Sequence, residues 1–163
     1  MNAIELLKKQ HRQVEQLFKE YEKLGDRAHA EKERIFTQIA DNLAAHASIE
    51  ERFFYPSVNA EDTEDLLLEA AEEHLAVKRV IADLLDLASS DETFDAKMKV
   101  LQELVDHHVG EEEEELFPKV KKAVEKDALE DLGIQMEASF LELLQTEPRA
   151  DVPAETAHAA PIH

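Results

Sequence analysis

The sequence predicts an all-α protein built around four long amphipathic helices. Only 3 glycines and 5 prolines interrupt the 163 residues, so the chain has few places to turn and its elements must be long. Glu, Ala, Leu and Lys, which are strong helix formers, are abundant. Apolar residues make up 44% of the chain and recur at helical spacing. That is enough apolar surface for one folded domain with a core.

The four long helices are expected one after another in the first 125 residues. Gly25 ends the first, Pro56 closes the second, and the fourth continues past Pro118. The expected ranges are about 2–24, 28–55, 62–88 and 92–125.

A shorter fifth helix is expected over about residues 127–144. Asp127, with Glu130 three residues later, is a variant of the capping box that opens helices. The last residues are rich in Ala, Pro and Thr and show little periodicity, which is typical of disorder. We therefore expect residues 1–125 to form the bundle, 126–145 an additional helix packed on it, and 146–163 a disordered tail.

The composition argues against several function classes. The charge of −20 repels a phosphate backbone and an anionic membrane surface, so neither nucleic acid nor membrane is an expected partner. The absence of cysteine excludes disulfides and thiolate metal sites. The N-terminal residues do not resemble a signal peptide, and no stretch approaches the roughly 20 apolar residues of a membrane span. A cytoplasmic protein is expected.

An internal duplication repeats polar residues as well as apolar ones. A His-x-x-Val block at His11 recurs 63 residues later at His74. A longer block recurs with an offset of 62: His46, Glu50, Glu51 and Pro56 reappear as His108, Glu112, Glu113 and Pro118. Each helix pair therefore contributes one lone histidine and one His-x-x-x-Glu. A repeat of core packing alone would not reproduce polar residues at core positions.

The repeated polar residues point to a pair of metal ions. Residues four apart in a helix lie only about 40° apart around its axis, so each His-x-x-x-Glu faces one way, together with the apolar stripe. Buried carboxylates and imidazoles need partners, and a metal pair supplies them. Imidazole and carboxylate without thiolate suit iron, with manganese or zinc as alternatives. The predicted ligands are His11, His46, Glu50, His74, His108 and Glu112.

Two further glutamates are candidates for an additional or supporting role. Glu115 lies seven residues after His108 and so returns to nearly the same helix face. Three roles are open for Glu115: it completes a coordination sphere, it orients a metal ligand, or it is one more exposed residue of an acidic run. Glu15 lies one turn after His11, at the position that Lys78 occupies in the repeat. These two either pair across the bundle or both lie at the surface.

Four sequence blocks resemble the hemerythrin-like HHE cation-binding domain family. They are His11-x-x-Val14, His46-Ala-Ser-Ile-Glu50-Glu51-Arg-Phe-Phe-Tyr-Pro56, His74-x-x-Val77 and His108-Val-Gly-Glu-Glu112-Glu113-Glu-Glu-Leu-Phe-Pro118. The resemblance implies an up-down-up-down four-helix bundle with a non-haem di-iron centre. The pattern of two histidines per metal also resembles the di-iron domain of bacterial proteins that repair iron–sulfur clusters under nitrosative stress. Oxygen-carrying members have a further histidine where this chain has Lys78, which argues against reversible oxygen transport.

Three classes of function remain at this point. The first is a di-iron module that binds or senses O2 or NO, or handles iron, in a stress response. The second is a di-iron enzyme with peroxidase, catalase-like or oxidase activity. The third is a structural helical bundle without metal. The expected partners are a small diatomic ligand or peroxide, and the expected state is a monomer or homodimer.

Overall fold

The computed structural model describes residues 1–163, all of the chain, and contains helices but no strand, so the all-α prediction is confirmed. The α-helices are α1 (Ala3–Glu22), α2 (His29–Ile49), α3 (Tyr55–Val58), α4 (Glu64–Leu85), α5 (Phe94–Glu111), α6 (Phe117–Ala123) and α7 (Lys126–Leu144). Two π-helical turns, η1 (Glu50–Phe54) and η2 (Glu112–Leu116), and a 3-10 helix, η3 (Pro148–Glu155), complete the chain. None of the helices combines the length and the apolar character needed to span a membrane.

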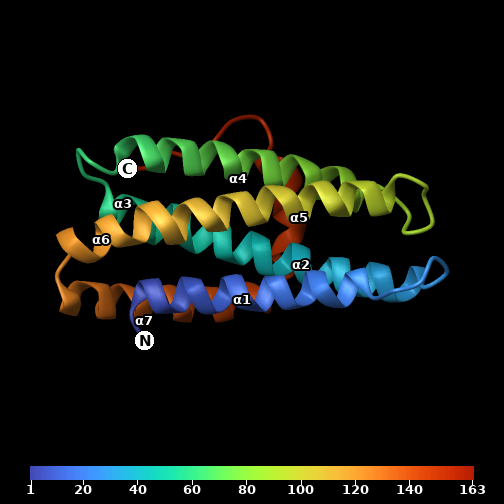
Figure 1. Ribbon diagram of the computed structural model, residues 1–163, viewed down its shortest axis with the longest axis horizontal. Coiled ribbons are helices and arrows are strands. Elements are labelled where there is room, and N and C mark those ends of the chain that lie inside the picture. Colours follow the sequence, from blue (N-terminus) through green and yellow to red (C-terminus); the bar gives the residue numbers. More distant parts are fainter.

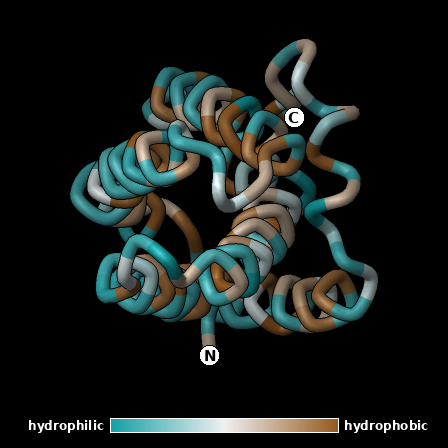
Figure 2. Tube along the Cα trace, turned by 90° about the vertical axis from the view of Figure 1, so that its right-hand side faces the viewer, coloured by the Kyte–Doolittle hydropathy of each residue, from teal (hydrophilic) through white to brown (hydrophobic).

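The long helices lie side by side along the long axis of the molecule and run in alternating directions (Figure 1). The π turn η1 joins α2 to α3, and η2 joins α5 to α6, so each pair forms one continuous rod. Seen end-on, the helices are grouped around a common interior (Figure 2). The helix α7 lies along α1 and also contacts α2.

Two apolar clusters form the core, and a polar layer lies between them. One cluster contains 20 buried residues and the other contains 16. Along α1, Leu7 belongs to the first cluster and Val14 to the second, with His11 between them. Along α2, Leu43 and Ile49 flank the polar layer in the same way. The helical period thus holds the polar side chains at one level of the interior.

The two π turns occupy equivalent places in the duplicated halves. Within each turn the backbone bonds to the residue five positions away: the N–H of Tyr55 donates to the carbonyl of Glu50, and that of Phe117 to Glu112. Pro56 and Pro118 follow directly, and a proline cannot donate the bond that a regular helix requires there. Single π turns are frequent at functional sites.

The disordered tail expected for residues 146–163 is not what the structure contains. The segment includes η3, and Val152 is 2% exposed. Arg149 pairs with Asp41 of α2 at 2.8 Å, and Arg79 of α4 donates to the backbone carbonyl of Thr156 at 3.0 Å. A few anchors hold this segment across α2 and α4, and such anchors produce no periodic pattern in the sequence.

Candidate metal centre

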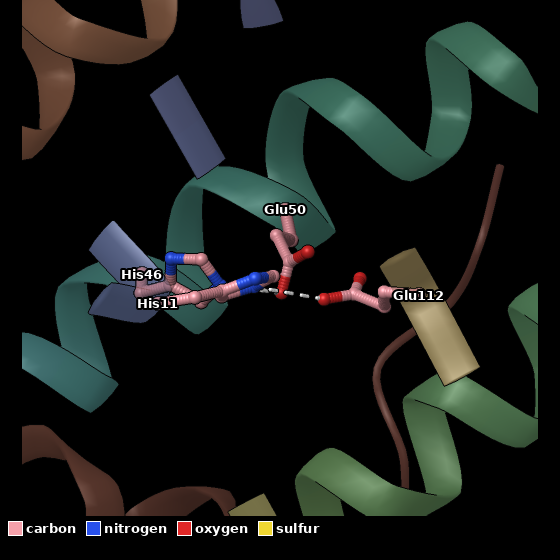
Figure 3. A group of neighbouring side chains, drawn as sticks. All are labelled: His11, His46, Glu50 and Glu112. Carbon is pink, nitrogen blue, oxygen red and sulfur yellow. Dashed lines mark ion pairs between the residues drawn. The ribbon is translucent and has the colours of Figure 1, made fainter. Parts of the chain in front are cut away.

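All six predicted ligand residues are buried, and the structure brings them together between the two apolar clusters. The π turns begin at the two glutamates, so Glu50 and Glu112 stand at the points where α2 and α5 widen. Figure 3 shows the imidazoles of His11 and His46 converging with these carboxylates. The six residues come from α1 (His11), α2 (His46), η1 (Glu50), α4 (His74), α5 (His108) and η2 (Glu112).

The ligand atoms form two groups that share Glu50. In the group of His11, His46, Glu50 and Glu112, the possible ligand atoms all lie within 4.8 Å of one another. The second group consists of Glu50, His74 and His108.

The carboxylates face histidines of both groups. Oε1 of Glu50 lies 3.2 Å from Nε2 of His46 and 3.1 Å from Nε2 of His74. Oε1 of Glu112 lies 3.3 Å from Nε2 of His11 and 3.3 Å from Nε2 of His108. Each glutamate therefore lies between the histidine pair His11 and His46 and the histidine pair His74 and His108.

The outer nitrogen of every inward histidine is held by an acceptor. Carboxylates and amide oxygens only accept, so Nδ1 carries the proton, and Nε2 of the neutral ring presents its lone pair to the centre. This is the arrangement that orients histidines in metal sites. The Nδ1 pairs are His11 with Glu113 at 2.6 Å, His46 with Gln10 at 2.6 Å, His74 with Glu51 at 2.7 Å and His108 with Glu73 at 2.8 Å.

Several buried atoms at the centre have no hydrogen-bond partner. They include Nε2 of His11 and of His46, Oε2 of Glu50 and Oε1 of Glu112. Buried polar atoms in proteins are nearly always bonded, and each exception needs a reason. Nitrogen and oxygen atoms that converge without bonding one another fit a divalent cation, so the residues present match the metal pair that the sequence predicts.

The charges of the site also favour a cation. Burial lowers the pKa of His11, but Glu112 and Glu113 outweigh it and raise that pKa to about 9. Burial likewise lowers the pKa of His108, and its carboxylate neighbours, Glu112 first, raise it well above its ordinary value. Burial raises the pKa of Glu50, yet His46 and other neighbours bring it well below the usual range. The carboxylates therefore make this part of the interior favourable for positive charge, and a bound cation would meet the same environment.

Tyr55 is a site residue that the sequence reasoning missed. Its side chain is fully buried, and its hydroxyl donates to Oε2 of Glu112 at 2.8 Å while lying 3.3 Å from Nε2 of His74. In a regular helix Tyr55 would lie about 140° around the axis from Glu50. The π turn brings it onto the inner face. The available signal was a break in the duplication, because the counterpart of Tyr55 is Phe117.

The two additional glutamates lie outside the cluster. Glu115 is exposed, because the π turn at Glu112 shifts the helix face on which it falls. Glu15 pairs with Arg12 at 3.0 Å. The Glu15–Lys78 pair is not formed: Lys78 is buried and pairs with Glu51 at 3.0 Å and with Glu155 of the C-terminal segment at 3.1 Å.

A small cavity of about 40 Å³ adjoins the centre. All four inward histidines border it, and most of its remaining wall is apolar. Val152 closes part of the wall, so the C-terminal segment contributes to the site's surroundings. A cavity of this size holds a molecule of a few atoms, since one water needs roughly 10–15 Å³ on the same measure. The other wall residues include Val14, Leu43, Val77, Ile81, Val105 and Val109, together with Gln10 and Lys78.

Comparisons with known proteins identify the family and the fold. A family model described as Hemerythrin HHE cation binding domain matches residues 2–120. A DNA nickase of Nostoc sp. is 26% identical over 145 residues, which cover 89% of this chain but only 41% of that protein. The crystal structure of a Hemerythrin HHE cation binding domain-containing protein from Mycobacterium kansasii is similar with a TM-score of 0.79 and 22% identity. The match covers 96% of this chain and 94% of that one. The structural likeness establishes the fold.

Proposed function

Because the chain belongs to the Hemerythrin HHE cation-binding domain family, we propose that its His/Glu cluster holds two iron ions. His11 and His46 would hold one ion, His74 and His108 the other, and Glu50 and Glu112 would lie between them. The observation that carries the proposal is the set of buried ligand atoms without hydrogen-bond partners, on histidines whose outer nitrogens are already held.

The donor set favours iron over the alternatives. Zinc in structural sites takes four ligands in a closed tetrahedron, whereas these groups offer open positions. Manganese prefers a larger share of oxygen ligands than four imidazoles and two carboxylates provide. Iron accepts both donor types and adds redox chemistry, which zinc lacks.

We propose that the centre binds or reacts with O2, peroxide or NO. The cavity beside the histidines has room for a molecule of that size, and its mostly apolar wall suits one without large polar groups. Lys78 occupies the position where oxygen-carrying relatives have another histidine, and its ammonium group is held by Glu51 and Glu155. One iron would therefore have one protein ligand fewer, which favours turnover or sensing over reversible oxygen carriage.

An enzyme of the peroxidase, catalase-like or oxidase class is the second candidate. The hydroxyl of Tyr55, which lies among the ligand atoms, favours this reading. A protic group at the centre is useful for chemistry that consumes protons, and simple storage of iron has no need of one.

We do not assign a nicking activity to this chain. The match to the DNA nickase covers less than half of that protein. The charge of −20 and a pI of about 4.7 disfavour contact with a phosphate backbone. DNA binding, measured at low salt where electrostatic attraction is strongest, is expected to be absent.

Metal analysis tests the proposal, and the chain offers matched controls. Wild-type protein, purified or reconstituted without oxygen, is expected to hold two iron ions. His46→Ala and His108→Ala should each lose metal, whereas His29→Ala and His158→Ala should keep it, because His29 and His158 are exposed and lie outside the cluster. Wild-type protein that takes up no metal would overturn the assignment.

Mixing the reduced, iron-loaded protein with each small molecule separates the two candidates. A stable or reversible spectral change with O2 or NO supports binding or sensing. Continuous loss of peroxide, with the iron retained, supports an enzyme.

A further inference from the structure

The side-chain amide of Gln10 has one hydrogen-bonding atom with a partner and one without. It is 3% exposed, and its Oε1 accepts the hydrogen bond from Nδ1 of His46 at 2.6 Å. With Nε2 of His46 as the proposed metal ligand, the ring proton lies on Nδ1, so the amide must present its oxygen to Nδ1. The amide orientation is thereby fixed, and its nitrogen points elsewhere. That nitrogen, Nε2, is buried and has no hydrogen-bond partner.

The duplication shows that holding the histidine does not require an amide. The counterpart of Gln10 in the second half is Glu73, which accepts from Nδ1 of His108 at 2.8 Å. A carboxylate can accept the hydrogen bond from a histidine Nδ1, and it has no N–H group that would remain without a partner. The amide at Gln10 therefore adds one thing that the other half lacks, a buried N–H donor.

The cavity beside the histidines is where this donor can act. Gln10 lines it, and the other polar side chains in its wall are the four histidines and Lys78. The outer nitrogens of the histidines are occupied, and their inner nitrogens face the metal positions. The ammonium group of Lys78 is held between Glu51 and Glu155. Nε2 of Gln10 is thus the polar donor of the wall that no protein group uses.

We propose that the Gln10 amide is a positioning and specificity residue for the cavity: it donates a hydrogen bond to a small ligand that carries an acceptor atom. The class is a ligand of two or three heavy atoms with an oxygen or nitrogen lone pair, such as azide, peroxide or a diatomic that gains negative charge at the metal. This inference rests on the proposed metal function. The inference adds that the cavity prefers ligands with a hydrogen-bond acceptor, and that this preference comes from the half of the site that contains His11 and His46.

Two substitutions isolate the donor from the other properties of Gln10. Gln10→Glu keeps an acceptor for His46, as Glu73 does for His108, but adds a charge. Gln10→Met is neutral and similar in length, but removes the acceptor. The one property that both variants lose is the N–H donor. Gln13→Met is the matched control, because Gln13 is an exposed glutamine of the same helix and does not border the cavity.

The experiment measures azide binding to the oxidised, iron-loaded protein, after metal content has been determined for each variant. Both Gln10 variants should weaken azide binding by about ten- to a hundredfold, the size expected for one hydrogen bond to a charged ligand. Gln13→Met should change it by less than about twofold, the usual scale of a surface substitution. The infrared stretch of bound azide should shift between H2O and D2O in wild type and lose that shift in both Gln10 variants.

The outcomes distinguish a failure of the proposed metal function from a failure of the role proposed for Gln10. Wild-type protein without metal defeats the proposed function itself. Normal metal content with unchanged azide affinity, or a solvent isotope shift that persists in both Gln10 variants, leaves the metal site standing and overturns the role of Gln10. The amide nitrogen would then be bonded to an ordered water alone.

Discussion

Glu51 accepts a hydrogen bond from Nδ1 of His74 at 2.7 Å, one residue beyond the glutamate proposed to join the two metals. The carboxylate orients the ring and makes its inner nitrogen a better electron donor. Glu51→Ala should therefore weaken metal binding by about 10- to 100-fold, the usual effect of removing such a partner. A competition titration with a chelator measures this. Glu114→Ala, at an exposed position of the equivalent turn, should leave the affinity unchanged.

The two tyrosines of the chain form a natural pair of test and control. Each donates its hydroxyl to a carboxylate: Tyr55 to Glu112 at 2.8 Å, and Tyr21 to Asp95 at 2.5 Å, away from the metal centre. Tyr55→Phe should alter the visible spectrum of the iron-loaded protein and its rate of reaction with peroxide. Tyr21→Phe should alter neither. Identical spectra for both variants would exclude Tyr55 from the centre.

Gly133 allows α7 to approach the N-terminal backbone closely. A Cβ at this position would lie 2.5 Å from the carbonyl oxygen of Met1 and 2.8 Å from the amide nitrogen of Ala3. These are backbone atoms and cannot rotate away, so Gly133→Ala should cost about 1–3 kcal/mol of stability. Urea unfolding of the metal-free protein measures the change. Gly110→Ala, where a Cβ meets nothing within 4 Å, should instead gain about 0.5–1 kcal/mol.

Asp95 contributes stability that depends on pH. The hydrogen bond from Tyr21 lowers its pKa, burial opposes this, and Lys32 at 3.0 Å lowers it further. A lowered pKa gives stability that is present above the unfolded value of about 3.9 and is lost as pH falls through the folded value. Asp95→Asn should therefore be less stable than wild type at pH 7, by under about 1 kcal/mol because Asp95 is exposed. The difference should shrink as pH falls below the unfolded value and vanish once pH is below the folded value. A gap that stays constant with pH would contradict this account.

Much of the fold and of the candidate site was available in the sequence. Helical spacing predicted an all-α chain, and the helix predicted over 127–144 is α7. The duplication singled out His11, His46, His74 and His108 together with two glutamates, and the structure brings these residues together. The clustering could be predicted because a repeated polar residue on an apolar stripe is a strong and local signal, and the role of these residues as metal ligands stays a prediction.

The remaining parts of the site and the C-terminal segment could not be predicted, because they depend on features that the spacing of apolar residues does not reveal. Tyr55 was missed because a regular helix was assumed through the π turn, and the same assumption left the position of Glu115 open between the helix face of His108 and the surface. Glu73 could not be told apart from a generally acidic surface, and the repeat of Glu51 as Glu113 did not reveal that these residues hold histidines. The C-terminal segment was judged by composition, whereas Val152 and the Arg149–Asp41 pair hold it in place.

The π turns also imply a way to recognise such sites in other chains. A π turn accommodates one residue more than an α turn, so the apolar stripe of the helix slips in phase by one position where the turn begins. In the rod of α2, η1 and α3, Ile49 and Glu50 are fully buried, and so are Phe54 and Tyr55, each five residues later. A pattern search that tolerates a one-residue phase slip would mark the two glutamates as the points of discontinuity. Such a search needs only the spacing of apolar residues and no assumption that a metal is bound.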